Sequence, residues 1–322
     1  REKSKVSRVQ LPAGIELSIK NRTLNVSIKN VAQDMQRNSV AFEGWILVLK
    51  CWLSDIIEFV VLDFKSSDDL VRKYGCPKAW HYNRFLYRLN IMLRIFPTWF
   101  SVKKERMGIV QDFIDWVDSN NLMLNHSLHE RKDVIGTKNM ERQIESWFVF
   151  HEGKKLLSER WNIDEDKLFN QLPVGVFINE IKEKNAVFPC RASAIDIWGV
   201  DKDGQGLHLI ELKCGNNRGL GVIGETLYYS SIIYNTCIAQ KPLFKFGKRD
   251  SAQDTSDTKT IKNDGNKFSR LSTYILAEKY HSLFSDDVVD LISNGLKNLG
   301  IRFEIAKYCY SKKDFADANN NS

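Results

Sequence analysis

The segment ASAIDIWGVDKDGQGLHLIELKC, residues 192–214, determines the fold that we expect for this chain. Its apolar runs Ala192–Val200 and Leu207–Cys214 are separated by the six residues Asp201–Gly206, which are rich in Asp, Gly and Lys. Short runs of Ile, Leu and Val favour buried strands, and a segment rich in Asp and Gly between them favours a turn. The segment therefore predicts a β-hairpin.

Two carboxylates and a lysine fall on one face of this predicted hairpin. Glu211 and Lys213 are two residues apart, so their side chains project to the same side of a strand, while Leu212 points to the other side. A hairpin that is symmetric about its turn places Asp196 opposite Glu211. Like charges at opposed positions destabilise a sheet unless something compensates them. A bound Mg²⁺ would compensate them and would also bind a phosphate.

The Glu-x-Lys tripeptide is common by itself and also fits a surface hairpin without a function. The order of features around it is much rarer: an apolar strand with Asp196, a Gly-containing turn, an apolar strand with Glu211-Leu212-Lys213, and a Gly-rich loop before a long helix. This order resembles the PD-(D/E)xK nuclease superfamily over about residues 138–280. Ile195 replaces the proline of the family motif, and Glu211-Leu212-Lys213 matches the second half of the motif fully.

The resemblance implies an α/β fold with a restriction-endonuclease-like α-β-β-β-α-β core, and it implies metal-dependent hydrolysis of phosphodiester bonds. Asp196, Glu211 and the backbone carbonyl of Leu212 would bind Mg²⁺, for which Mn²⁺ would substitute. Lys213 would hold the scissile phosphate or orient and help to deprotonate the attacking water. DNA is the expected substrate because the superfamily mostly cuts DNA, and no residue here indicates contact with a 2′-hydroxyl.

Members of the superfamily often have a further Glu on the first helix. Glu141 and Glu145 are the candidates here. At 100° per residue, Glu141 lies nearer the apolar stripe of Met140, Ile144 and Phe148, so we expect Glu141 to assist at the metal. The alternative, that both glutamates are solvated helix residues, stays open.

Other constellations are interpreted as structural. Glu225 and Tyr229 follow on the next helix, where RecB-like members of the superfamily have Gln-x-x-x-Tyr, and a structural helix face is favoured over a role in positioning water or DNA. Asp63-Phe64-Lys65 fails as a second copy of the motif, because Asp55 and Glu58, the nearest upstream acids, leave no room for a preceding strand and turn. His126-x-x-His129-Glu130 lies in a polar segment without partner cysteines, so surface histidines are expected there.

Basic residues suit a polyanionic partner. Lys and Arg number 47 against 40 Asp and Glu, a net charge of +7. Gly247–Arg270 is polar and lacks apolar periodicity, which predicts a mobile loop. Lys248, Arg249, Lys259 and Lys262 in this loop are expected to contact the phosphate backbone, although a solvated loop fits the composition equally well.

The chain length of 322 residues predicts two domains. A boundary is expected near residues 125–137, between an α+β accessory domain (residues 1–130) and the nuclease-like domain (residues 138–312). The accessory half is expected to contain a hairpin within Ile15–Ile28, a helix, a strand (Ile57–Phe64) and the helices His81–Phe96 and Arg106–Val117. The second half is expected in the order α-β-β-β-α-β-α-β, with a helix from Met140, strands at Val174–Ile178, Ala192–Val200, Leu207–Cys214, Ser272–Lys279 and Arg302–Tyr308, and helices at Leu220–Ala239 and Asp286–Leu299.

The apolar stretches are too short to cross a bilayer, and the six cysteines contain no C-x-x-C pair, so we expect a cytoplasmic protein without a zinc site. A role in bacterial defence or restriction is plausible for such a nuclease, and DNA repair is the next setting. A homo-oligomer, or a protein partner of the N-terminal domain, stays open.

Other classes of function remain as alternatives. The chain could be a non-catalytic module that binds nucleic acid or assembles with a partner, and it would then bind DNA in EDTA without cutting it. Paired carboxylates also occur in glycoside hydrolases, but that chemistry leaves Lys213 without a role.

Overall fold

The computed structural model describes residues 11–35, 40–65, 70, 72–127, 129–130, 132–134, 139–190, 193–215, 219–247, 254–264 and 268–308. The N-terminal half begins with the antiparallel strands β1 (Ile15–Lys20) and β2 (Thr23–Ile28). Asn21 and Arg22 connect them with φ of 50° and 60°, the left-handed pair that a two-residue hairpin turn requires. The predicted hairpin is confirmed.

Two helical crossovers extend this sheet in the order β1-β2-β3-β4. Helix α1 (Phe42–Trp52) leads to β3 (Phe59–Phe64), parallel to β2, and α2 (Trp80–Ile95), preceded by η2 (Pro77–Ala79), leads to β4 (Phe100–Val102), parallel to β3. Helix α3 (Lys104–Ser119) packs on α2. The strand and helices predicted for this half are therefore present.

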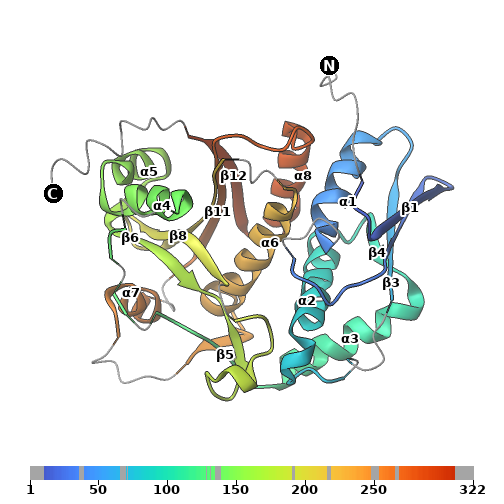
Figure 1. The fold of residues 1–322 in the computed structure, drawn as a ribbon, viewed down its shortest axis with the longest axis horizontal. Coiled ribbons are helices and arrows are strands. Elements are labelled where there is room, and N and C mark those ends of the chain that lie inside the picture. The colour runs from blue at the N-terminus through green and yellow to red at the C-terminus, as the bar shows by residue number, and fades with distance from the viewer. Residues whose placement is uncertain are drawn as a thin grey trace.

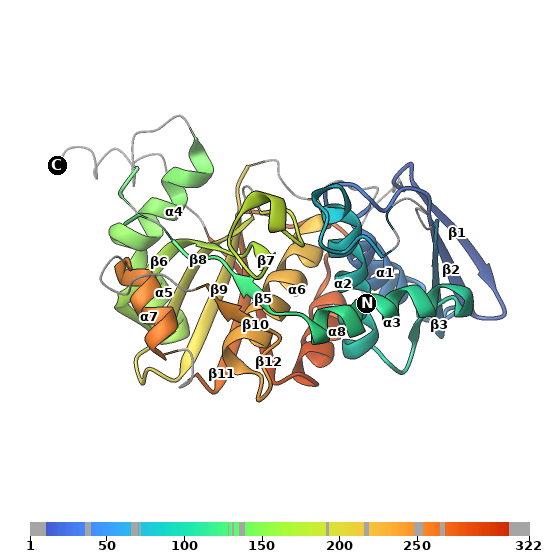
Figure 2. The same ribbon diagram turned by 90° about the horizontal axis from the view of Figure 1, so that it is seen from below.

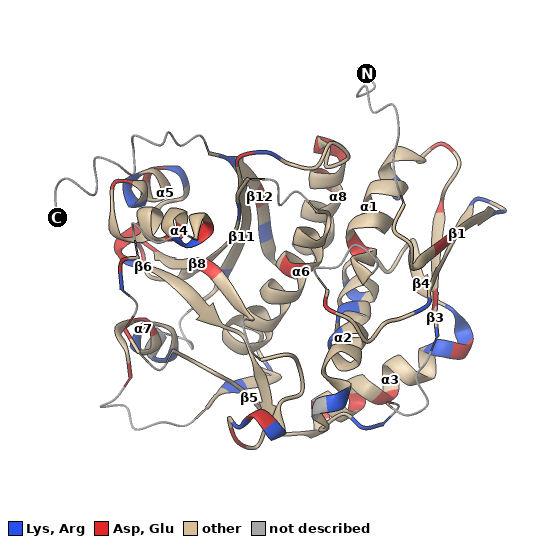
Figure 3. Cartoon of the chain, in the orientation of Figure 1, with Lys and Arg blue, Asp and Glu red and all other residues tan. Residues whose placement is uncertain are grey.

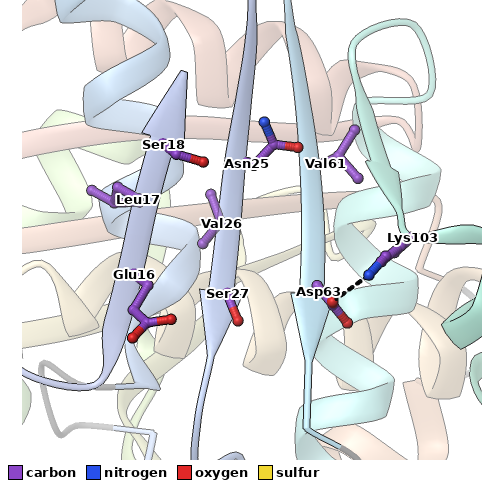
Figure 4. Close-up of a pocket in the computed structure, with 9 residues that line it drawn as sticks. All are labelled: Glu16, Leu17, Ser18, Asn25, Val26, Ser27, Val61, Asp63 and Lys103. Atoms are coloured by element: carbon purple, nitrogen blue, oxygen red, sulfur yellow. Dashed lines mark hydrogen bonds and ion pairs between the residues drawn. The ribbon is translucent and has the colours of Figure 1, made fainter. Parts of the chain in front are cut away.

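The two faces of this sheet differ. Residues Leu24, Val26 and Ile28 of β2 are buried, and the residues between them face outward. The outer face has a hollow of about 380 Å³ lined by Glu16, Leu17, Ser18, Asn25, Val26, Ser27, Val61, Asp63 and Lys103 (Figure 4). Asp63 accepts hydrogen bonds from Lys103 Nζ at 3.0 Å and Arg106 Nε at 3.1 Å, in agreement with a charge cluster at the end of a strand.

The C-terminal half is built on a sheet in the order β12-β11-β9-β8-β6. Strands β6 (Ile163–Pro173), β8 (Ala194–Asp201) and β9 (Gly206–Lys213) are antiparallel neighbours. Helix α6 (Gly221–Ile233), extended by the π-helix η4 (Tyr234–Ile238), leads on to β11 (Arg270–Ala277), which is parallel to β9. Helix α8 (Asp286–Lys297) then leads to β12 (Ile301–Lys307), parallel to β11. The predicted α/β class is confirmed.

Helices cover both faces of this second sheet (Figures 1 and 2). Helices α4 (Met140–Phe150) and α5 (Gly153–Trp161) pack on one face, where Ile144 and Phe148 contact a buried cluster that includes Ile197 and Leu212. Helices α6 and α8 lie on the other face, between the second sheet and α1. Each face of β9 therefore points into a different part of the interior.

The sequence missed α5 and β6. In strand β6, Ile163 is followed by four charged residues, Asp164–Lys167, and the strand has a bulge between Ile163 and Leu168. It is the edge strand of its sheet, where charged residues are tolerated because one side of the strand faces solvent. Because its first residues are mostly charged, β6 lacks the apolar pattern by which the other strands were predicted.

A small sheet in the order β10-β5-β7 has its central strand, β5, directly before the expected domain boundary. Strand β5 (Leu122–Leu124) pairs with β7 (Val176–Ile178), which is followed by η3 (Glu183–Asn185), and with β10 (Phe244–Phe246). The last residues of the predicted strand Val174–Ile178 do form a strand, but that strand belongs to this small sheet. The strand beside β8 is β6, so the expectation that Val174–Ile178 is the first core strand is wrong. The division into two domains stays a prediction.

The expectation of a mobile loop over Gly247–Arg270 is wrong for residues 256–264, which form α7 (Ser256–Asp264). Ile261 is buried and anchors this helix. Ser127 Oγ and Thr255 Oγ1 both donate hydrogen bonds to the buried Asp257. These polar anchors come from distant residues, so apolar periodicity does not reveal them.

The two halves pack closely through α1, α2, α6 and α8, and one continuous apolar cluster includes residues of all these helices. A buried ion pair between Arg88 of α2 and Glu43 of α1 lies against Gly224 of α6. At Gly44 of α1, a Cβ atom would lie 2.5 Å from the Leu220 carbonyl oxygen. Within the described residues, no helix combines the length and the apolar character needed to cross a membrane.

We predict that Gly44→Ala lowers the free energy of unfolding by about 1–3 kcal/mol, because the added Cβ overlaps the backbone at Leu220. Gly108→Ala is the matched control, since Gly108 also lies within a helix, α3, but faces open space. There the higher helix propensity of Ala should raise the free energy of unfolding by up to about 1 kcal/mol. Denaturant unfolding measures both effects, and an equal gain in the two variants would contradict the close packing of α1 on α6.

Candidate active site

The hairpin β8–β9 has the register expected from its sequence. The pairs run from Val200↔Leu207 to Ile197↔Ile210, and one further step would place Asp196 opposite Glu211. The ladder ends before that step. Instead, Leu212 N donates a hydrogen bond of 2.8 Å to Asp196 Oδ2. The carboxyl group of Asp196 thus replaces a strand partner at the point where the two strands part.

Lys213 is held between carboxylates from two elements. Its Nζ lies 2.7 Å from Glu211 Oε1 on β9 and 3.1 Å from Glu225 Oε2 on α6. The side chains of all three residues are at most 10% exposed. A buried ammonium is tolerated only when acceptors surround it. The sequence predicted that Glu211 and Lys213 share a face, and this is confirmed, but it treated Glu225 as structural.

Sequence analysis favoured Glu141 over Glu145, and the two glutamates differ in burial on α4. Glu145 is buried, and its Oε2 accepts a hydrogen bond of 2.8 Å from Gln171 Nε2 on β6. Glu141 is only partly buried, in the first turn of α4. Met140 is 38% exposed, so the buried face of α4 begins at Ile144, and the role of Glu141 at the metal stays a prediction.

Gln171 has a φ of 56°, a left-handed backbone that is strained for a residue with a side chain. It lies within β6, near the end of that strand. Strain of this kind persists where the surrounding structure requires it, and it often accompanies functional sites. Gln171 could not be found from the sequence, because β6 itself was not predicted.

The carboxyl groups of the site raise one another's pKa. Burial, together with the charges of Glu145 and Glu141, raises the pKa of Asp196 to about 8, against the opposing effect of Lys213. Burial and the charges of Glu141 and Glu211 raise the pKa of Glu145 to about 7. Burial and then the Asp196 charge raise the pKa of Glu211 well above its usual range. Negative charge is therefore concentrated here beyond what the surroundings favour.

Burial by itself would lower the pKa of Lys213, but the charges of Glu211, Glu225 and Asp196 raise it well above its ordinary value. Lys213 therefore stays an ammonium ion at neutral pH. It can hold an anion or stabilise developing negative charge, but it is a poor base. Of the roles that the resemblance implies, binding of the phosphate fits this environment better than deprotonation of water.

Tyr229 lies beside the same carboxyl groups. Burial, and then the charges of Glu225 and Glu211, raise the pKa of this phenol well above its usual range. Tyr229 therefore keeps its proton and acts as a neutral hydroxyl group.

The carboxyl groups fit a hard cation. Glu211 Oε2 is buried and has no hydrogen-bond partner among the described residues, so it is an unused acceptor. In the described part of the chain, no three His, Cys, Asp or Glu side chains converge as a complete metal-binding group. Mg²⁺ commonly takes only one or two protein carboxylates and completes its coordination with waters and substrate phosphates. Asp196 and Glu211 match this requirement in number and chemistry.

Two of the four basic residues expected to bind DNA are described by the structure. Lys248 and Arg249 lie outside the described residues. Lys259 is exposed on α7, but Lys262 Nζ forms an ion pair of 3.1 Å with Asp254 Oδ2, which engages its charge within the protein. Figure 3 shows Lys and Arg dispersed over the described elements. A contribution of Lys259 to DNA binding stays a prediction.

The two histidines of the expected linker differ in burial. His129 is exposed, as predicted, whereas His126 is buried, with its Nδ1 3.1 Å from the Ser127 carbonyl oxygen. His126 lies just after β5, the central strand of the small sheet, and this position accounts for its burial.

Comparison with protein-family models finds none that matches the chain, and comparison with curated proteins finds no match.

We predict that the free energy of unfolding in EDTA falls as the pH rises from about 4 to about 8. The folded protein keeps protons on Asp196 and Glu145 up to pKa values of about 8 and 7, whereas the unfolded chain releases them near pH 4. The folded state then binds more protons than the unfolded state, so the free energy of unfolding decreases as the pH rises across this window. The stabilising contribution of these protons is complete below about pH 4 and is lost above about pH 8.

Chemical denaturation at a series of pH values measures this slope. Asp196→Asn should reduce the slope of stability against pH, because the amide of Asn has no carboxyl proton to release. Glu159→Gln, an exposed position on α5, should leave the slope unchanged. A wild-type stability that does not fall between pH 5 and 8 would show that these carboxyl groups are not mutually destabilised.

Proposed function

We propose that this chain is a Mg²⁺-dependent nuclease that hydrolyses phosphodiester bonds in DNA. The observation that carries the proposal is the placement of Lys213 between Glu211 and Glu225, beside Asp196, at the end of β9. An ammonium ion beside several carboxyl groups, with the unused acceptor Glu211 Oε2 among them, suits a substrate that brings negative oxygen atoms and a divalent cation.

The topology supports a restriction-endonuclease-like core. The order α4, β6, β8, β9, α6, β11 gives a helix, three antiparallel strands, a helix and a strand parallel to the third. This is the α-β-β-β-α-β arrangement that the resemblance implies, with α5, β7, β10 and α7 as additions. The site residues lie on the second and third of these strands, where the superfamily has its acidic pair and lysine.

Asp196 and Glu211, with the Leu212 carbonyl, would hold Mg²⁺. The bound ion supplies positive charge that offsets the charge developing on the phosphate oxygens. Lys213 has three N–H donors, of which two face Glu211 and Glu225, and the third can donate to an oxygen of the scissile phosphate.

Glu145 is suited to proton transfer. Its pKa of about 7 means that both protonation states are populated near neutral pH, and Gln171 orients its carboxyl group. We assign to Glu145 the uptake of the proton that the attacking water loses. Glu141 acts on the site only through its charge, which raises the pKa of Glu145 and Asp196.

The rival functions fit less well. A glycoside hydrolase needs its two carboxylates free to face a sugar, whereas Glu211 is engaged by Lys213. A non-catalytic binding module has no need of a buried ammonium among carboxyl groups that raise one another's pKa. A cytoplasmic role in bacterial defence or restriction is part of the proposal and rests on the resemblance.

We predict that Lys213→Ala and Asp196→Asn each reduce Mg²⁺-dependent DNA cleavage by about 10²–10³-fold, because each removes an interaction with the charge of the transition state. Circular dichroism and DNA binding should stay close to wild type. Lys202→Ala is the matched control, since Lys202 is exposed in the turn at the opposite end of the same hairpin. Cleavage that persists in EDTA, or in both site variants, would refute the proposed function.

We expect Glu145→Gln to reduce kcat far more than Glu141→Gln, because only Glu145 is buried against Gln171. The pH–rate profile distinguishes the roles: Glu145→Gln should remove an ionisation near pH 7, whereas Glu141→Gln should shift it slightly downward by removing a neighbouring negative charge. A larger effect of Glu141→Gln would restore the assignment made from the sequence.

A further inference from the structure

The two halves of the chain repeat one topology. In the N-terminal half, the hairpin β1–β2 is followed by α1, by β3 parallel to β2, by α2, and by β4 parallel to β3. In the C-terminal half, the hairpin β8–β9 is followed by α6, by β11 parallel to β9, by α8, and by β12 parallel to β11, with β10 and α7 inserted between α6 and β11. Each half is thus a β-β-α-β-α-β unit with the same strand order, which we call the N-unit and the C-unit.

The two units face each other through equivalent helices. Figure 1 shows α1 and α2 of the N-unit against α6 and α8 of the C-unit, with the two sheets on the outside of these helices. The contacts are reciprocal: Gly44 near the start of α1 abuts Leu220 at the start of α6, and Gly224 near the start of α6 abuts Glu43 of α1. This is the arrangement of a dimer formed by two like subunits.

The catalytic positions can be compared between the units. Glu211 and Lys213 occupy the face of β9 directed toward α6, and Lys213 belongs to the last pair that β9 makes with β11. The last pair that β2 makes with β3 contains Ile28, so Ile28 is the equivalent of Lys213 and Val26 is the equivalent of Glu211. Val26 pairs with Leu17 of β1, and one further step of the hairpin register in the C-unit would place Asp196 opposite Glu211.

The N-unit therefore has Leu17, Val26 and Ile28 where the C-unit has its acids and lysine. Val26 and Ile28 are buried in the apolar core beneath α1. The conclusion does not depend on the alignment chosen, because all the inner-face residues of this hairpin are apolar: Ile15, Leu17, Ile19, Leu24, Val26 and Ile28. These side chains cannot bind Mg²⁺ or a phosphate.

The N-unit also lacks the elements that complete the site. Strand β6 and helix α4 contribute Gln171 and Glu145 to the C-unit and precede its hairpin in the chain. In the N-unit, the outer sheet face is the open hollow of Figure 4, lined by polar residues such as Ser18, Asn25 and Ser27. Nothing among the described residues covers it in the way that α4 covers the C-unit sheet.

We propose that the chain is an internal pseudo-dimer with one active site, and that one binding event therefore breaks one strand of duplex DNA. This inference rests on the proposed nuclease function and specifies its product. A symmetric dimeric endonuclease can cut both strands because each of its sites meets one strand. Here the α6–α8 surface, through which a second C-unit would pack equivalently, is already covered by the N-unit.

Each event consumes one water molecule and one phosphodiester bond. The oxygen of water bonds to phosphorus, the P–O bond to one deoxyribose oxygen breaks, and that oxygen leaves with a proton. The other strand stays intact, so the product is nicked duplex.

Covalently closed supercoiled plasmid with Mg²⁺ is the direct test, because it distinguishes one cut strand from two. Open circles should accumulate first, at a rate proportional to protein concentration. Linear plasmid appearing together with the first open circles, or cleavage restricted to the ends of linear DNA, would overturn the inference and leave the nuclease function standing. Absence of Mg²⁺-dependent cleavage on every DNA form would instead overturn the proposed function.

A mixing experiment tests whether one chain acts alone. With plasmid in excess over all protein, wild type is combined with a molar excess of Lys213→Ala. The nicking rate should be the same as that of wild type by itself, because each chain contains all the residues of its active site. A fall in the rate would show that active sites from two chains cooperate, which would overturn the single-site inference.

Discussion

The buried ammonium of Lys213 is the constraint on which the rest of the site depends. A charge taken out of water must be met by opposite charge, and Lys213 is met by Glu211 from its own strand and Glu225 from α6. This pairing requires that β9 end against the first turns of α6. The hairpin register, the parting of the strands at Asp196 and the burial of α6 are all consistent with that requirement.

The same site carries more acid than its lysine can balance. Asp196, Glu145 and Glu211 each have a raised pKa, in part because they act on one another, and Glu211 keeps an unused buried oxygen. Such an arrangement is costly for the fold and is readily explained by a function that brings in positive charge. The strained backbone at Gln171, which serves Glu145, is a second local cost at the same place.

The relation of the N-terminal half to the C-terminal half is visible in its topology and not in its sequence. It repeats the C-unit without the acids, the lysine, β6 or α4, and it places its own helices where an equivalent subunit would dock. The close approach at Gly44 and Gly224, and the Arg88–Glu43 ion pair beside it, bind the two units firmly. The N-terminal half thus covers α6 and α8.

The sequence by itself determined the features that local periodicity encodes. Alternation in β9 was enough to place Glu211 and Lys213 on one face, and the turn before it set the hairpin register that the structure has. Most helices and strands of both halves followed from the same patterns. The α/β class and the core of the candidate site could be predicted on this basis.

Only the tertiary structure decided which distant residues complete the site. The burial of Glu145 against Gln171 depends on how α4 lies on β6, a polar edge strand that local patterns did not reveal. Helix α7 likewise forms through Asp257 and Ser127, far apart in the chain. The ion pair of Lys213 with Glu225 and the packing of the N-unit on the C-unit also arise from contacts between distant segments. No local sequence pattern encodes the burial and charge that these contacts create.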